Sequence, residues 1–257
     1  MEVHAHTHSS PATGGAPRKK WTHYFWEFLM LFLAVFCGFF AEYQLEHKIE
    51  KDREKQYMES MLEDLAADTL MLQNRMLRSG RMQKGLDSLK TWLYDTPSAE
   101  KNTETIYRQN ASYTRQIIPS FSDQTATQLR NSGSMRLIRK RNVANDISKY
   151  GRRANNIERT CENFNEIIED RASLEDRIFN RKYWSIIATD TASSLDIYSI
   201  DPAAKLLTLD ENQLIGFGNI TDRLQLFISR FIIPQLIRLN QNAIELITLI
   251  KKEYHLK

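Results

Sequence analysis

The chain has 257 residues, and 35 Lys and Arg against 32 Asp and Glu give a net charge of +3, which supplies no drive toward nucleic acid or acidic surfaces. Only nine glycines and six prolines occur, and four of these lie within the first 17 residues. What remains is too poor in turn residues for a sandwich, a barrel or a doubly wound sheet. Two cysteines, Cys37 and Cys161, cannot form a disulfide framework. The composition predicts an all-α protein.

Residues 1–20 form a small, polar tail that is rich in Pro and Gly and is expected to be disordered. His4, His6 and His8 alternate within it, and imidazoles at such spacing can bind Zn, Ni or Cu. A structural metal site needs four ligands and a preformed shell, which a disordered tail lacks. The three histidines are therefore weak metal candidates, and no cofactor is predicted.

Residues 21–43 have the composition of a membrane-spanning helix. No charged residue occurs from Phe28 to Ala41, and aromatic residues gather at both ends of the stretch, as they do at membrane interfaces. At 1.5 Å per helical residue, Tyr24 to Tyr43 measures about 30 Å, which is the thickness of a hydrocarbon core. A buried core helix and a cleaved signal peptide are the alternatives. Phe39 occupies a position where cleavage needs a small residue, which favours an uncleaved anchor.

The flanking charges give an orientation. Residues 18–20 read Arg-Lys-Lys with no acid among them, whereas cations and acids are mixed between residues 42 and 55. Cations next to a span favour the cytoplasmic side, so we expect a cytoplasmic N-terminus and a periplasmic domain in a bacterial inner membrane.

Glu27 lies about one turn inside this span, where an ionisable side chain is a functional candidate. It could act as a proton relay or a helix contact, which would suit a small subunit of a membrane transport or energy-coupling complex. The alternative is that Glu27 lies near the interface, reaches outward or is protonated, and has no specific role.

Residues 44–257 are predicted to continue as a helical bundle. The first helix should run on to about residue 93 and end at residues 95–98, and a shorter helix should cover 103–118. Two stretches carry apolar residues in alternating steps of three and four, which is the pattern of a buried helix face. We call these the apolar seams: Val143, Ile147, Tyr150, Ala154, Ile157, Cys161, Phe164 and Ile168 in the first, and Leu236, Leu239, Ala243, Leu246 and Ile250 in the second.

Between these stretches, residues 183–210 are the least regular part of the chain and contain no convincing strand. A helix resumes at Glu211, and Pro234 should kink it because proline removes a backbone hydrogen bond. Long helices of this kind bury one another most simply as an antiparallel bundle. The first seam could also pair with a second copy of the chain, which makes a homo-oligomer a further candidate.

Basic residues are concentrated in one stretch. It could contact lipid headgroups, a phosphorylated or acidic ligand, or the acidic face of a partner. Without interleaved aromatic residues, nucleic acid is not expected, and a solvated face balanced by nearby acids is the alternative. The members are Arg130, Arg136, Arg139, Lys140 and Arg141, with Arg152 and Arg153 nearby.

A catalytic constellation is missing from the sequence. Outside the tail only His23, His47 and His255 remain, and none could serve as the base of a nucleophilic site in the bundle. Residues 216–218 read Gly-Phe-Gly, which on a helix is more typical of a close contact than of a phosphate-binding loop. We therefore expect a non-enzymatic partner-binding, scaffold or sensor module whose partners are the bilayer and another membrane or envelope protein.

Two further stretches carry a family resemblance. Residues 54–68 read Glu-Lys-Gln-Tyr-Met-x-x-Met-x-x-Asp-Leu-x-x-Asp directly after the Trp21–Glu42 span. Residues 132–138 read Ser-Gly-Ser-Met-x-Leu-Ile, followed by Ile147 and Tyr150. In this order of features the chain resembles an uncharacterised family of bacterial proteins, mostly from Bacteroidota, with a short N-terminal segment, one span and a helical domain. The resemblance implies a location and an architecture, and no activity.

Overall fold

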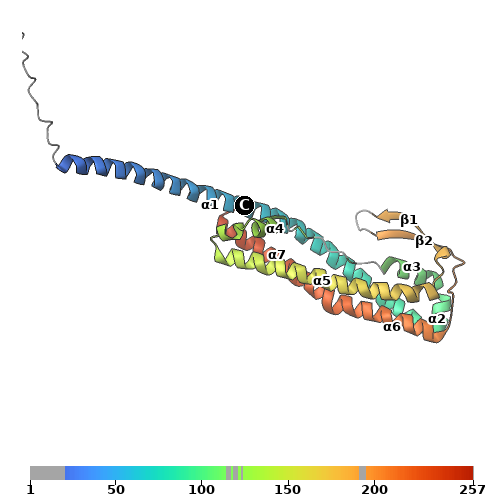
Figure 1. Cartoon of the computed structure of the whole chain (residues 1–257). Coiled ribbons are helices and arrows are strands. Elements are labelled where there is room, and N and C mark those ends of the chain that lie inside the picture. Colours follow the sequence, from blue (N-terminus) through green and yellow to red (C-terminus); the bar gives the residue numbers. More distant parts are fainter. Residues whose placement is uncertain (1–20, 114–116, 118–120, 123, 191–194, 257) are drawn as a thin grey trace, which may run out of the picture. The chain divides into compact units, whose positions relative to one another are not determined.

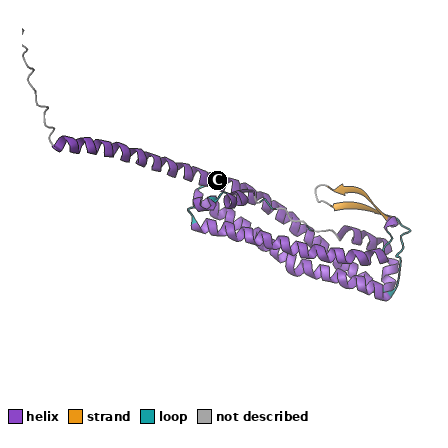
Figure 2. Ribbon diagram, viewed as in Figure 1, coloured by secondary structure: helices purple, strands orange, loops and turns teal. Residues whose placement is uncertain are grey.

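The computed structural model describes residues 21–113, 117, 121–122, 124–190 and 195–256, and it confirms the all-α class (Figure 1). Apart from one two-stranded sheet, the described elements are helical, as the colouring in Figure 2 makes plain. The chain divides into two units, residues 1–52 and 53–257. Helix α1 (Trp21–Leu93) contributes to both units, so the predicted long helix ending near residue 93 is confirmed.

The part of α1 in the first unit is an exposed apolar helix. Phe28, Phe32, Phe36 and Phe40 follow one another at four-residue spacing, and their rings stack with centroids 6.1 to 6.4 Å apart. This spacing places them on one helix face. Among the described residues, α1 is the one helix long and apolar enough to cross a membrane, and its apolar window is not buried at all.

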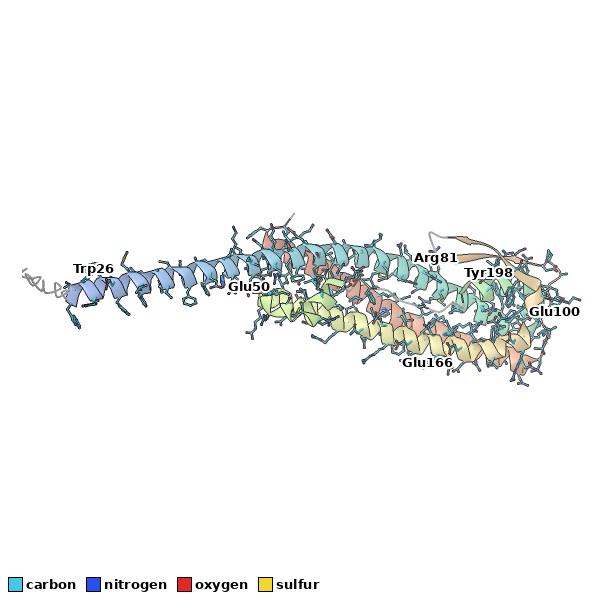
Figure 3. All side chains as sticks on the ribbon, turned by 45° about the horizontal axis from the view of Figure 1, so that its top comes forward. Trp26, Glu50, Arg81, Glu100, Glu166 and Tyr198 are labelled. Atoms are coloured by element: carbon cyan, nitrogen blue, oxygen red, sulfur yellow. The ribbon has the colours of Figure 1, made fainter. Side chains whose placement is uncertain are left out.

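Three long helical segments build the second unit. They are α1 from Arg53 onward, α5 (Arg141–Ile178), and a C-terminal rod made of α6 (Glu211–Phe227), a π-helical turn η3 (Ile228–Ile232) and α7 (Ile233–Tyr254). Polar side chains such as Arg81 and Glu166 cover their outer faces (Figure 3).

Contacts between these segments fix their directions. Glu54 bonds to Tyr254, and Lys90 bonds to Asp222, so the C-terminal rod is antiparallel to α1. In contrast, Glu54 bonds to Arg139 just before α5, and Asp68, further along α1, bonds to Tyr150 within α5, so α1 and α5 run parallel. The predicted antiparallel arrangement therefore holds for the rod but not for the α1–α5 pair.

The parallel pair is possible because the chain between α1 and α5 returns along the bundle in short pieces. These are α2 (Thr96–Lys101), α3 (Thr103–Tyr113), α4 (Gln124–Asn131) and the 3₁₀ turn η1 (Ser134–Leu137). A helix was expected over 103–118, and α3 begins at Thr103 as predicted; residues 114–116 and 118–120 lie outside the described part of the chain. Side chains of α5 and α1 accept hydrogen bonds from the backbone of this returning segment. The Asn165 side-chain oxygen accepts from the Ile117 N–H at 2.9 Å, and the Asp64 carboxylate accepts from the Thr125 N–H at 3.0 Å.

Both apolar seams form the core of the bundle. Every member of the seams is buried except Ile168, which is half-buried against the same core. Along the rod the buried positions 224, 228, 232 and 236 are spaced by four residues three times in succession. Three α-helical turns hold about 11 residues. The π-helical turn accommodates the extra residue, and it lies directly before Pro234, where a kink was predicted.

A second, smaller core lies where α1 and α5 end. Tyr107, Phe179 and Trp184 pack ring against ring there, with centroids 4.9 to 5.9 Å apart. Trp184 opens an antiparallel hairpin of β1 (Trp184–Asp190) and β2 (Leu195–Ile200), which follows the short turn η2 (Arg181–Tyr183). The prediction that residues 183–210 contain no strand is wrong, because this hairpin gains burial against α3 and the aromatic cluster.

Candidate functional site

Two buried carboxylates of α1 hold the bundle together. Asp68 is 1% exposed, and its carboxylate accepts from the Ser122 N–H and the Tyr150 hydroxyl, each at 2.7 Å. Glu54 is 4% exposed and accepts from the Arg139 N–H at 2.7 Å and the Tyr254 hydroxyl at 2.5 Å. Buried carboxylates need such donors to offset the loss of water. Because each carboxylate accepts two hydrogen bonds from other segments of the fold, we assign both groups a structural role.

Arg171 on α5 is the largest fully buried side chain described. Its guanidinium bonds to Thr221 at 3.3 Å, to Glu175 at 3.2 Å and to Asn110, and lies 4.1 Å over the ring of Phe217. Burial lowers the pKa of Arg171 to about 10, and the Glu175 carboxylate opposes that shift. Arg171 thus joins α3, α5 and α6, and each of its three guanidinium nitrogens has a protein partner, so we assign it a structural role.

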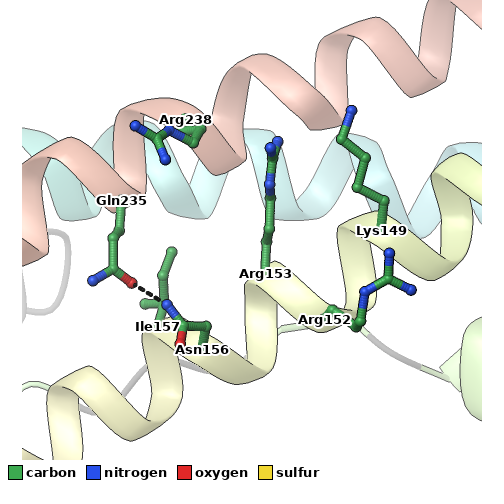
Figure 4. Close-up of a pocket in the computed structure, with 7 residues that line it drawn as sticks. All are labelled: Lys149, Arg152, Arg153, Asn156, Ile157, Gln235 and Arg238. Atoms are coloured by element: carbon green, nitrogen blue, oxygen red, sulfur yellow. Dashed lines mark hydrogen bonds between the residues drawn. The ribbon is translucent and has the colours of Figure 1, made fainter.

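A hollow between α5 and α7 has a different character. Its volume is about 580 Å³, within the range of small-molecule sites. Four of its seven lining side chains are cationic: Lys149, Arg152, Arg153 and Arg238. Asn156, Gln235 and Ile157 complete the lining (Figure 4). We call this hollow the cationic groove.

The helical repeat explains how the groove forms. Lys149, Arg153 and Asn156 are spaced by four and three residues, so they share one face of α5 next to the apolar seam, and Arg152 adjoins this face. Arg238 comes from α7, and Figure 4 shows the Arg153 side chain reaching between the two helices. Arg153 is half-buried, whereas the other three cations are exposed.

Two amides fix the wall of the groove. Asn156 on α5 donates to the Gln235 side-chain oxygen on α7 at 3.1 Å, and Gln235 in turn donates to the Thr160 hydroxyl at 3.1 Å. These bonds cross between the helices, so they hold the two walls in register. The groove is therefore preorganised, which lowers the entropic cost of binding.

No acid is among the described residues that line the groove. Within the described part of the chain, none of its four cations forms an ion pair. Such a concave, one-sign surface focuses the electrostatic potential and attracts anions. Guanidinium groups also present paired N–H donors that match phosphate and carboxylate oxygens. The groove is thus suited to binding an anion.

The basic residues predicted as contacts have varied surroundings. Arg139 and Lys140 face acids: the Arg139 Nε lies 4.0 Å from Glu54, and the Lys140 ammonium lies 3.3 Å from Glu253. Arg130 is exposed and donates to Thr127, and Arg136 and Arg141 are exposed. The structure therefore does not gather these five residues into one site. Only their neighbours Arg152 and Arg153 line the groove.

The remaining candidates lie elsewhere. Glu27 is about half exposed, with its carboxylate 3.3 Å from the His23 imidazole one turn earlier on α1. His4, His6 and His8 fall outside the described residues. Among the residues that are described, no group of three or more His, Cys, Asp or Glu side chains could hold a metal ion. Cys161 is buried in the first seam, as predicted, and burial raises the pKa of its thiol to about 11.

Gly218 makes the close contact that the Gly-Phe-Gly stretch predicted. A Cβ at this position would lie 2.6 Å from the Tyr94 ring, whereas one at Gly216 would meet nothing within 4 Å. The Tyr94 hydroxyl donates to the Asn219 side chain at 3.0 Å, so the ring is held against Gly218.

No family model, curated protein or solved structure matches the chain. The case for a function therefore depends on the residues of this chain and their chemistry.

Proposed function

We propose that the protein is a single-span membrane protein whose helical bundle is a non-enzymatic binding module. The observation that carries the proposal is the exposed, uncharged run from Phe28 to Ala41 at the start of α1, a helix that goes on to supply one wall of the bundle core. Leaving so many aromatic and aliphatic side chains in water is costly, and a bilayer removes that cost.

The cationic groove supports the binding role. Apart from Ile157, its side chains are guanidinium, ammonium and amide groups. Groups of this kind hold charge and donate hydrogen bonds, which suits recognition better than proton transfer. The groove is therefore the surface through which we expect the bundle to act as a sensor or scaffold.

The proposed location is the inner membrane of a bacterium, with the N-terminus in the cytoplasm and the bundle in the periplasm. The Arg-Lys-Lys run at residues 18–20 supports this orientation. Another membrane or envelope protein remains the proposed macromolecular partner, and self-association is a further candidate.

Cysteine labelling on intact cells tests the proposal. In a Cys37→Ser background, Glu100→Cys places a thiol on the exposed surface of α2. Cys161 can stay in place, because it is 1% exposed and its raised pKa keeps the thiol protonated. We expect a membrane-impermeant maleimide to label Glu100→Cys in intact cells. A matched variant, Ser10→Cys in the tail, should be labelled only after lysis.

Two results would contradict the proposal, one from labelling and one from membrane extraction. Labelling of Ser10→Cys but not of Glu100→Cys in intact cells would place the bundle in the cytoplasm and overturn the orientation. Release of the wild-type protein from membranes by alkaline carbonate would overturn the membrane span itself.

A further inference from the structure

The cationic groove carries an inference about its ligand. Four cations from two helices surround one hollow, and no acid is among the described residues that line it, so solvent and salt must screen much of their mutual repulsion. The nearest acids along the two helices do not line it; they are Asp146 and Glu158 on α5 and Glu245 on α7. An anion bound among the four cations would remove this repulsion.

The number and kind of the cations indicate the charge of the ligand. A single carboxylate would neutralise only one of four positive charges. Three of the cations are arginines, whose planar donors pair with two phosphate oxygens at once, and the lysine adds a point charge of the kind found in phosphate sites. Several phosphoryl groups therefore satisfy this lining better than one carboxylate does.

The other lining residues indicate that the ligand has a part without charge. Asn156 and Gln235 offer amide groups, and Ile157 offers an apolar surface. A volume of about 580 Å³ also exceeds what a single inorganic phosphate would fill. We propose that the groove binds a small molecule that carries two or more phosphoryl groups on a polar organic body. This inference deepens the proposed function, since it names the ligand class of the binding module.

Calorimetric titration of the full chain in a neutral detergent tests the inference, with inorganic tripolyphosphate as the probe. We expect saturable binding at one site per chain. The double variant Arg153→Ala/Arg238→Ala removes one cation from each wall and should weaken binding by at least about tenfold, because charged hydrogen bonds are lost. Arg153→Lys/Arg238→Lys keeps the charges but not the paired donors, and should show an intermediate loss.

The matched control is Arg136→Ala/Arg141→Ala. It removes the same number of charges from exposed positions outside the groove, so the affinity should change by less than about twofold. Equal losses in the two double-alanine variants would show that net charge alone attracts the probe, and would overturn the inference. Far-UV circular dichroism and thermal unfolding of each variant verify that the fold is intact.

Two competitors separate the ligand classes. Citrate, a tricarboxylate, should compete more weakly than tripolyphosphate, and stronger competition by citrate would overturn the assignment to phosphoryl groups. Tighter binding of poly-glutamate would also overturn it, in favour of an acidic segment of a partner protein.

Nanodiscs distinguish a soluble ligand from a lipid headgroup, which share the same chemistry. Cardiolipin in phosphatidylcholine nanodiscs is tested as a competitor of tripolyphosphate for the groove. If it lowers the affinity of the wild-type chain for tripolyphosphate but not that of Arg153→Ala/Arg238→Ala, the phosphoryl groups that the groove binds belong to a lipid headgroup. If it leaves the affinity unchanged, the ligand is soluble. Failure of the membrane proposal shows in carbonate extraction, and failure of this inference shows in the titration, so the two are distinguishable.

Discussion

Asp68 on α1 and Tyr150 on α5 are 82 residues apart in sequence and share a buried hydrogen bond of 2.7 Å. This bond joins two parallel helices. Burial, together with this bond, raises the pKa of Tyr150 above its usual range, so the phenol remains a donor throughout the physiological pH range. The same carboxylate holds the backbone of Ser122, which leads into α4. One side chain thus positions α5 and the returning chain relative to α1.

We expect Tyr150→Phe to lower the free energy of unfolding by about 1–3 kcal/mol, because one oxygen of Asp68 loses its donor in a buried place. Urea unfolding of the full chain in detergent, followed by far-UV circular dichroism, measures the change. Tyr57→Phe is the control, since the half-buried Tyr57 hydroxyl has no hydrogen-bond partner among the described residues. Equal losses in the two variants would contradict the role of Asp68.

Gly218→Ala should destabilise the bundle by about 1–3 kcal/mol, because the added Cβ would lie 2.6 Å from the Tyr94 ring. Gly216→Ala should instead stabilise it by up to about 1 kcal/mol, since alanine favours a helix and meets nothing there. Thermal unfolding measures both. In Tyr94→Ala/Gly218→Ala the cost of the added methyl should disappear. If that cost persists without the ring, the close contact is not its cause.

Deletion of Arg230 should be tolerated. It removes one exposed residue from the π-helical turn and leaves the buried positions of the rod spaced by four, three and four residues, as an α-helix requires. Deletion of Gln241, which is also exposed but lies within α7, should rotate every later seam residue away from the core. Soluble yield in detergent and thermal unfolding compare the two. A greater loss from the Arg230 deletion would refute the spacing argument.

Cys161 should be inert in the folded protein. In a Cys37→Ser background we expect no reaction with a thiol reagent at pH 8, and full reaction once urea unfolds the chain, because the buried thiol stays protonated up to about pH 11. The folded state keeps a proton that the unfolded state releases above pH 9, so the contribution of the thiol to stability falls as the pH rises from 9 to 11. Comparison with Cys37→Ser/Cys161→Ala isolates this fall; identical pH dependence in both would contradict it.

Much of the fold could be predicted from sequence, because apolar residues at helical spacing report burial directly. Both seams follow from such spacing, and the end of α1 follows from the helix-ending residues 95–98. The π-helical turn was also visible in principle, since the steps of four from Leu224 to Leu236 exceed the helical repeat. The hairpin was not, because a β-bulge between Ile186 and Ala188 breaks the alternation that identifies a strand.

The groove illustrates what sequence could not supply. Arg152 and Arg153 stood next to the predicted basic stretch, but Arg238 lies 85 residues further on. Nothing in the sequence places α7 beside that turn of α5. The sequence also does not reveal that Arg139 and Lys140 face Glu54 and Glu253, acids far away in the chain.

The contact between Glu54 and Tyr254 has a mechanical consequence. It brings the start and the end of the second unit together, since the rod is antiparallel to α1. A force that pulls residues 54 and 254 apart would load their contacts one after another, as in unzipping, instead of shearing all of them at once. The bundle should thus yield to tension at its ends at low force, with α7 peeling from the rest of the bundle turn by turn.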